Sequence, residues 1–254
     1  MVAIPEQLLA EIVAEASLDT YLVIADHLTA HGDPRGELIV ATHRLLTTPD
    51  DAALRAHVDE LLTRERAKFD HAVGFESPSE ASSASTWHFG FVRSLRLERA
   101  TPERVRAALS HPSACLLERL ELWLELPDHA DLVFARPRVA MLSLAINCTK
   151  RPACEHAAPL PWSMLPNLVA LRLEGAHLVH DVAHPTIERL RLAGASLCEP
   201  TWQLPRLHTL IWQQPRLDAF ERLCRAAPPA LRELDFYCAE KDRARLRELR
   251  SERR

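Results

Sequence analysis

Lysine, glycine and cysteine are scarce in this sequence, and each scarcity narrows the possible functions. Only three of the 31 basic residues are lysines, so the positive charge is almost entirely guanidinium, which suits planar contacts with carboxylates and aromatic rings; codon bias in a GC-rich genome explains this ratio equally well. Six glycines leave few places where backbone N–H groups can cradle a phosphate. Six scattered cysteines indicate reduced thiols rather than a disulfide framework.

Targeting, membrane-spanning and catalytic motifs are missing too. The start of the chain lacks the basic and apolar segments of a secretion signal, and no apolar run reaches the roughly 18 residues of a membrane span. The formal net charge of -4 gives no general attraction to nucleic acid. No nucleophile elbow, P-loop, dinucleotide-binding glycine pattern or His-Glu-x-x-His run occurs. We therefore expect a cytoplasmic, non-catalytic protein with no cofactor, no bound metal, and no nucleic-acid or membrane partner.

The N-terminal part of the chain predicts four helices, because apolar residues recur there every three to four positions. Gly32-Asp33-Pro34 is typical of a helix end, since Gly adopts the left-handed turn and Pro cannot continue the helix. Thr48-Pro49-Asp50-Asp51 resembles a helix start with the Thr48 hydroxyl as the cap. The predicted helices span residues 5–16, 18–31 and 35–47, and a fourth runs from this cap to about Phe69.

The stretches Gln7–Ile12 and Tyr21–Ile39 resemble the bacterial repeat-companion domain, whose pattern is a helix followed by L-V-Y-A-D-W-L-x-E-x-G-D-P-R-G-E-F-I. This sequence departs from the pattern at Ile24 and His27, where the family has aromatic residues. The resemblance implies a helical module that precedes repeats, often leucine-rich ones, and implies no activity.

Within the matched stretch, we expect Asp26 and the Gly32–Gly36 loop to hold the helices together, with Arg35 or loop N–H groups as partners of the carboxylate. The alternative is a metal or acid–base cluster, and its members are Asp26, His27, His31 and Asp33.

Seven copies of one six-residue pattern follow: an apolar residue, two variable residues, Leu, a variable residue and an apolar residue. We call each copy a rung. The central leucines are separated by 25, 22, 29, 19, 20 and 24 residues, close to the roughly 20–29 residues of a leucine-rich repeat. The rungs are Val92–Leu97, Leu117–Leu122, Val139–Leu144, Leu168–Leu173, Ile187–Leu192, Leu207–Trp212 and Leu231–Phe236.

These rungs predict an α/β fold: a leucine-rich-repeat solenoid with a curved parallel sheet of about seven strands. Short helices, predicted over Thr101–Ser110 and Leu217–Ala226, alternate with extended returns on the convex side. The predicted division is a helical domain over 1–73, a Ser-rich linker or surface loop over 74–86 and the repeats over 87–254, where Glu240–Arg254 is a capping helix.

Alternate residues of a strand point to opposite faces, so each rung has an inside and an outside. The outward side chains form a predicted concave surface, where Arg and aromatic residues are typical of protein-binding sites. We expect it to bind a protein partner; the alternative is a solvated face with cross-strand ion pairs such as Glu174 beside Arg191. The candidate binding residues are Arg96, Arg119, Glu121, Trp123, Arg172, Glu174, Arg189, Arg191, Ile211, Asp235 and Tyr237, with Glu98, Ser143 and Glu233 among them on the same face.

Two further hypotheses remain open from the sequence. Cys148, Cys154 and His156 lie within nine residues, and thiolate and imidazole are the ligands of zinc and the partners of thiol catalysis. A group of three histidines follows and offers further imidazole ligands for zinc: His177, His180 and His184. The chain is alternatively a structural subunit of a larger assembly.

Overall fold

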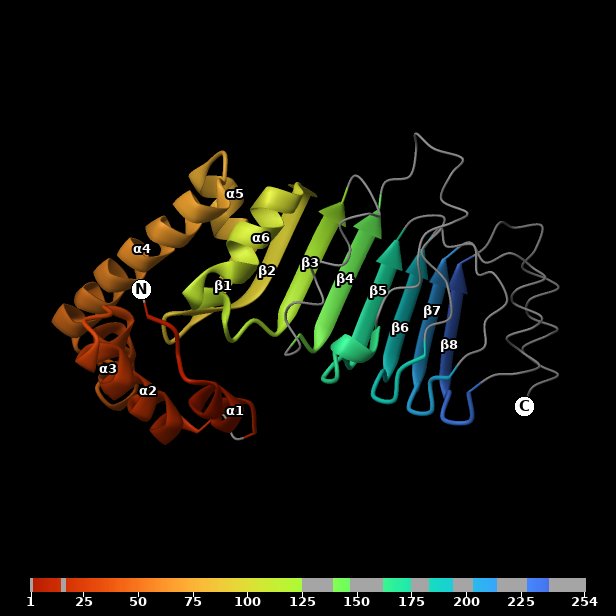
Figure 1. Ribbon diagram of the computed structural model, residues 1–254, viewed down its shortest axis with the longest axis horizontal. Coiled ribbons are helices and arrows are strands. Elements are labelled where there is room, and N and C mark those ends of the chain that lie inside the picture. The colour runs from red at the N-terminus through yellow and green to blue at the C-terminus, as the bar shows by residue number, and fades with distance from the viewer. Residues whose placement is uncertain are drawn as a thin grey trace. The chain divides into compact units, whose positions relative to one another are not determined.

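The structure is a computed structural model with an α/β fold (Figure 1). An eight-stranded, mostly parallel sheet has its strands in chain order, β1 to β8. The chain divides into two compact units: unit 1 contains Met1–Arg96 and Glu103–Leu117, and unit 2 contains Leu97–Pro102 and Glu118–Arg254. The described residues are 2–14, 17–124, 139–146, 162–174, 183–193, 203–213 and 228–237.

Unit 1 opens with the four predicted helices: α1 (Glu6–Ala14), α2 (Leu18–Ala30), α3 (Arg35–Thr47) and α4 (Ala52–Val73). The cap predicted for α4 is wrong. The Thr48 hydroxyl donates to the Arg44 carbonyl at 2.9 Å and so belongs to the end of α3. The carboxylate of Asp51 caps α4, because it accepts the Leu54 N–H at 2.9 Å.

Glycines set the corner between α2 and α3. Gly32 has φ = +70°, the left-handed conformation that ends α2. Gly36 is buried where the two helices approach closely: a Cβ there would lie 2.7 Å from the Ala25 carbonyl oxygen and 2.8 Å from the Thr29 backbone nitrogen. The two helix backbones therefore approach as closely as they do only because residue 36 has no side chain.

A buried ion pair holds this corner. The Asp33 carboxylate accepts Nε of Arg35 at 3.0 Å and a second guanidinium nitrogen at 2.9 Å, and both side chains are fully buried. The Val2 N–H donates to Asp33 at 2.8 Å, and the Val2 carbonyl accepts from Arg35 at 2.8 Å. The pair thus ties the N-terminal segment to the start of α3.

The expectation that Asp26 is the buried carboxylate is wrong. Asp26 is exposed, because it lies about 200° around α2 from Ile24, at 100° per residue, and the buried stripe of the helix consists of Tyr21, Ile24, Ala25 and Leu28. Asp33, in the loop after the helix, is the carboxylate that Arg35 binds.

The segment 74–86, predicted to be a linker or surface loop, contains a helix, α5 (Pro78–Ala84). Ser77 caps it by accepting the Glu80 N–H at 3.2 Å, and Glu80 accepts the Glu76 N–H at 2.8 Å. The two bonds satisfy N–H groups at the start of α5, and Pro stands in its first turn. The low apolar content that suggested a loop reflects small residues, since Ala81 and Ala84 are buried.

Strand β1 (Ser85–His88) is the eighth strand that the seven rungs did not predict. It pairs antiparallel with β2 (Phe91–Ala100) through a two-residue turn in which Phe89 and Gly90 both have positive φ. The aromatic residues of this hairpin pack in unit 1: Phe89 stacks on Tyr21 at 4.6 Å, and Trp87 meets the edge of Phe69 at 5.6 Å. The predicted helix after β2 is confirmed as α6 (Pro102–Ser110), which precedes the short helix η1 (Pro112–Ala114).

Unit 2 repeats one strand geometry (Figure 1). Its parallel strands are β3 (Arg119–Leu124), β4 (Met141–Ile146), β5 (Ala170–Glu174), β6 (Arg189–Ala193), β7 (Thr209–Gln213) and β8 (Glu233–Tyr237), with η4 (Trp162–Met164) before β5. Each strand begins two residues after the start of its rung. The central leucine of every predicted rung is at most 5% exposed, which confirms the inward positions: Leu95, Leu120, Leu142, Leu171, Leu190, Leu210 and Leu234.

One backbone arrangement recurs between neighbouring rungs of unit 2. The Glu118 carbonyl accepts the N–H groups of both Ala140 and Met141, at 2.9 and 3.0 Å. The carbonyls of Ala140, Val169, Glu188 and His208 do the same for the next rung in each case. The repeated bond fixes the start of each strand against the preceding one, so the outward side chains fall into straight rows.

Two sequence predictions fall outside the described residues: the helix over 217–226 and the capping helix over 240–254. Within the described part of the chain, no helix combines the length and the apolar character needed to cross a lipid bilayer.

Replacing Asp33 by Asn is expected to lower the free energy of unfolding by about 3–5 kcal/mol, because it leaves the buried Arg35 charge uncompensated. Burial opposes ionisation of Asp33, but hydrogen bonds from Arg35, from the Val2 N–H and from the Arg35 N–H outweigh it and hold the Asp33 pKa well below its usual value of 3.8. This stabilisation is present above that value and is lost as the pH falls below it.

Urea unfolding followed by circular dichroism measures the effect. The control is Asp59→Asn, at an exposed position of α4, which should change stability by less than about 0.5 kcal/mol. Equal unfolding midpoints for the two variants would contradict the role of the ion pair.

Candidate binding site on the outward face of the sheet

The outward side chains of β3 to β8 form three rows, because the parallel strands pair without offset. We call these residues the outward face. The first row is Arg119, Met141, Ala170, Arg189, Thr209 and Glu233; the second is Glu121, Ser143, Arg172, Arg191, Ile211 and Asp235; the third is Trp123, Ala145, Glu174, Ala193 and Gln213, whose register partner on β8 is Tyr237.

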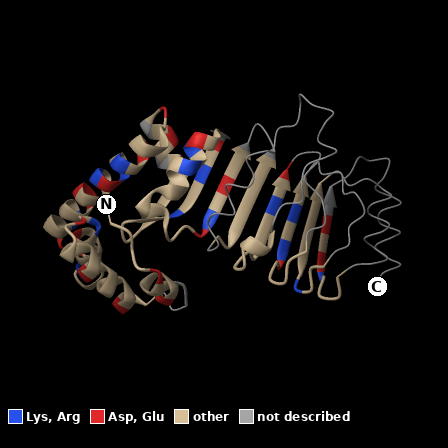
Figure 2. Ribbon diagram, in the orientation of Figure 1, with Lys and Arg blue, Asp and Glu red and all other residues tan. Residues whose placement is uncertain are grey.

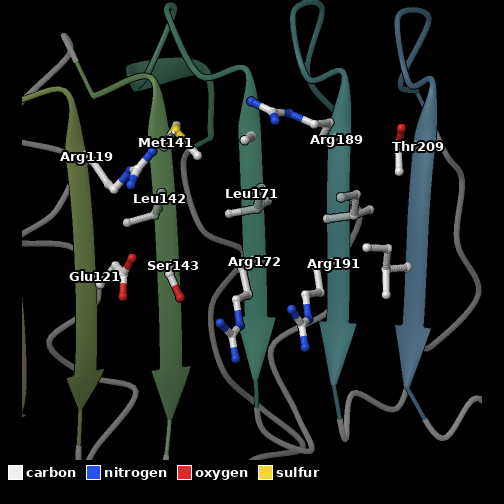
Figure 3. Close-up of a pocket in the computed structure, with 13 residues that line it drawn as sticks. Arg119, Glu121, Met141, Leu142, Ser143, Leu171, Arg172, Arg189, Arg191 and Thr209 are labelled. Atoms are coloured by element: carbon white, nitrogen blue, oxygen red, sulfur yellow. Dashed lines mark hydrogen bonds between the residues drawn. The ribbon is translucent and has the colours of Figure 1, made fainter. Parts of the chain in front are cut away.

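A hollow of about 370 Å³ lies on the first two rows, between β3 and β7 (Figure 3). Its floor contains small side chains, Ser143 and Ala170, and the core leucines Leu142, Leu171 and Leu190 also line it. Longer side chains surround them: Arg119 reaches toward Met141, and its guanidinium donates to the Met141 sulfur at 3.3 Å. The hollow therefore arises from the alternation of short and long residues along the rows.

The lining of this hollow is strongly basic. Four arginines, Arg119, Arg172, Arg189 and Arg191, face one carboxylate, Glu121. Figure 2 shows the basic positions gathered on β5 and β6 of unit 2, with acidic positions on β8. An anion that enters the hollow meets positive charge on three strands.

Two of these arginines lie directly opposite one another. Arg172 of β5 and Arg191 of β6 are register partners, about 4.8 Å apart along the sheet, and their guanidinium groups extend side by side in the same direction (Figure 3). Like charges at opposed positions destabilise a sheet. The Nε of Arg191 is also buried without a hydrogen-bond partner among the described residues.

The predicted ion pair between Glu174 and Arg191 is wrong. Register places Ala193, not Arg191, opposite Glu174. Glu174 instead binds Arg172 of its own strand, with one carboxylate oxygen 2.6 Å from Nε and also in contact with a terminal nitrogen. Arg172 is thus partly neutralised, whereas Arg189 and Arg191 form no ion pair with another described residue.

The other predicted binding residues divide between the hollow and its surroundings. Ile211 lines the hollow, and Trp123 lies outside it with 45% of its surface exposed. Asp235 is exposed on β8, and Tyr237 is the last residue of that strand, with a side chain outside the described part. Arg96 is exposed on β2 but belongs to unit 1.

Besides the core leucines Leu142, Leu171 and Leu190, the lining of the hollow includes three outward residues that were not predicted. The three are Met141, Ala170 and Thr209. They occupy the first outward position of their strands, which the leucine pattern indicates as outward but which carries no charge or aromatic ring at these rungs. Thr209 also donates to the Glu233 carboxylate across the strand pair, at 2.9 Å.

The metal or acid–base cluster that the sequence left open in unit 1 is tested by the positions of its members. Among the described residues, no group of three or more His, Cys, Asp or Glu side chains is placed to hold a metal ion. The rings of His27 and His31 lie 4.5 Å apart and bind backbone carbonyls, while Asp33 is occupied by Arg35. Asp26, His27, His31 and Asp33 therefore do not form the cluster that the sequence left open.

The other two candidate groups lie largely outside the described residues. Cys148, Cys154 and His156 are all outside them, and so are His177 and His180 of the histidine group.

The remaining histidine of that group, His184, is buried. Its Nε2 lies 3.0 Å from the Leu165 carbonyl, and its Nδ1 lies 3.3 Å from the Thr186 N–H. Burial lowers the pKa of His184. This histidine links two neighbouring turns and is inaccessible to a substrate.

A second hollow, of about 560 Å³, lies in unit 1 between α4 and α5. Asp70 and Arg66 are among its lining residues, and burial raises the pKa of Asp70 while Arg66 opposes that rise. One Asp70 oxygen is buried without a hydrogen-bond partner in the described part of the chain. Its charges are mixed, unlike those of the first hollow, where four arginines face one carboxylate.

No family model, no curated protein and no solved structure matches this chain. The function is therefore inferred from the residues of the outward face themselves.

Replacing His111 by Asn is expected to flatten the pH dependence of stability between pH 6.5 and about 4. His111 is buried and caps η1, with Nδ1 accepting the Ser113 N–H at 3.1 Å. Burial, together with the charge of Arg35, lowers its pKa from 6.5 to about 4. The unfolded chain thus binds a proton that the folded chain excludes, so stability falls as the pH drops through this range.

Asn keeps a side-chain oxygen at the cap without titrating. The measurement is the free energy of urea unfolding across this pH range, with exposed His71→Asn on α4 as the control. If the free energy of unfolding depends on pH equally in His111→Asn and in the original protein, His111 is not the source of this pH dependence.

Replacing Arg191 by Gln is expected to raise the free energy of unfolding by about 0.5 kcal/mol at low salt, because it removes a cation opposed to Arg172. The gain should shrink in about 0.5 M NaCl, where surface charges are screened. Urea unfolding at both salt concentrations tests this, with Arg206→Gln, at an exposed turn before β7, as the control. A loss of stability in Arg191→Gln would show that the two arginines do not repel each other significantly.

Proposed function

We propose that this protein is a non-catalytic recognition or scaffold protein that binds a protein partner through the outward face of unit 2. The observation that carries the proposal is the hollow across β3 to β7, where four arginines surround small outward residues. Arginine presents a planar donor group that binds carboxylates in paired hydrogen bonds. It is also enriched among the residues that contribute most to protein interfaces.

The fold that we propose for unit 2 is a leucine-rich-repeat solenoid, with the outward face as its concave side. Supporting it are the parallel pairing in chain order, the buried leucine of every rung and the recurring carbonyl bond between rungs. Stacked units of this kind expose long, regular surfaces that bind other proteins.

We propose that unit 1 is a repeat-companion domain. The matched stretch forms α2, the Gly32–Gly36 corner and the start of α3. Asp33, Arg35 and Gly36, which belong to the family pattern, are buried and hold the corner together. The proposed role of this unit is therefore structural, in a bacterial protein of the cytoplasm, where scattered cysteines remain reduced.

The mixed character of the outward face supports a protein as the ligand. Apolar Met141 and Ile211 line the hollow together with its arginines, and Trp123 exposes 45% of its surface on the third row. Protein interfaces combine such apolar and aromatic contacts with charged groups at their edges.

The test is affinity capture from a lysate of the source cells, with quantitative mass spectrometry. Arg172→Glu and Arg191→Glu together are expected to lower recovery of the specific partner by at least about tenfold. Ser143→Trp, which fills the floor of the hollow without changing its charge, should lower recovery as well.

The control is Arg206→Glu, which changes the same charge outside the outward face. Recovery equal to that of the original protein in both the charge and the Ser143 variants would contradict the proposal. Circular dichroism of each variant establishes that it is folded.

A further inference from the structure

We infer that the hollow binds an acidic, extended segment of a protein partner, and that the guanidinium groups of Arg172 and Arg191 together bind one of its carboxylates. This inference rests on the proposed function and specifies the chemistry of the partner. Its basis is the juxtaposition of Arg172 on β5 and Arg191 on β6 with small residues on β4 and β5 that leave room for a ligand.

The opposed arginines provide the first argument. Arg172 and Arg191 are register partners whose side chains extend in parallel. Glu174 supplies one carboxylate to Arg172, but Arg191 has no ion pair with another described residue. A carboxylate placed between the two guanidinium groups receives hydrogen bonds from both and removes their repulsion. The free protein thus retains an unfavourable contact that this ligand relieves.

The extent of the hollow provides the second argument. Its arginines lie on β3, β5 and β6, and three strand spacings separate Arg119 from Arg191, roughly 14 Å. One small anion cannot reach both ends of such a site. Several carboxylates on one chain can, so the ligand is a segment with repeated acidic residues.

The acidic residues of the outward face distinguish a peptide from a nucleic acid. Glu121 lines the hollow, Glu174 lies in the third row beside it, and Glu233 and Asp235 lie on β8. A phosphate backbone carries a charge at every step and meets this acidic rim. A peptide places carboxylates only where arginines are, and its apolar side chains contact Met141 and Ile211.

The experiment uses the full chain and fluorescence anisotropy with three labelled probes. The first is a peptide of about eight residues, long enough to cross the hollow when extended, with Glu alternating with Leu. The second has Gln in place of Glu, and the third is a single-stranded thymidine oligonucleotide of equal charge. Binding of the Glu peptide is expected to exceed that of the other two by at least about tenfold.

The variants locate the site. Arg191→Gln and Arg172→Gln are each expected to weaken the Glu peptide at least about tenfold, and added salt should weaken it in the original protein. The matched control, Arg206→Gln, should bind like the original protein.

Equal binding of the Glu and Gln peptides, tighter binding of the oligonucleotide, or an unchanged affinity in both arginine variants would each overturn the inference. These results are separable from failure of the proposed function. If Ser143→Trp abolishes capture of the cellular partner while the Glu peptide does not bind, the proposal that the outward face binds a partner is supported. The inference that its ligand is acidic is then wrong. If neither the Ser143 nor the arginine variants change capture, the proposal that the outward face binds the partner is wrong.

Discussion

The parallel pairing of strands without offset is the constraint on which the structure of unit 2 depends. From Glu118 through to His208, one carbonyl before each strand accepts the N–H groups of the second and third residues of the next rung. This bond sets where every strand begins, and a shift of one residue would turn each leucine out of the core. Because the register is the same at every step, the core leucines stack on one side and the outward residues form rows on the other.

The rows bring residues that are far apart in the sequence together into one site. Ser143 and Ala170 are unremarkable alone, but between arginines and Met141 they become the floor of a hollow. Register also places Arg172 against Arg191, a contact that costs stability in the absence of an anion. Proteins retain such local conflicts mainly at functional sites, and this reasoning connects the packing of the sheet to the proposed recognition of an acidic partner.

Unit 1 depends on a different kind of contact. Its corner combines a glycine without room for a Cβ with the fully buried pair of Asp33 and Arg35. Buried ion pairs contribute little net stability, yet removing one partner is costly, so the pair enforces one geometry for the loop. Because Asp33 and Arg35 also bind the backbone of Val2, that geometry extends to the start of the chain. The role of these residues in packing the corner therefore accounts for their presence in the stretch that resembles the repeat-companion pattern.

Several features follow from the sequence alone, because they depend on local periodicity. The four helices, the positions of the seven strands and the division of each rung into inward and outward residues were all predictable from apolar spacing. Arg119, Arg172, Arg189 and Arg191 were correctly placed on the outward face for the same reason. Helix α5 was missed because small residues can pack closely while the sequence appears merely polar.

Only the tertiary structure decided which outward residues meet. The spacing between rungs varies from 19 to 29 residues, so the sequence does not state which residue of one strand lies opposite a given residue of the next. Register placed Ala193 rather than Arg191 opposite Glu174, and the folded corner of unit 1 showed that Arg35 pairs with Asp33 while Asp26 faces solvent. The sequence determined the two faces of the sheet, and long-range backbone pairing determined the site, because contacts between rungs join residues that are neighbours in space alone.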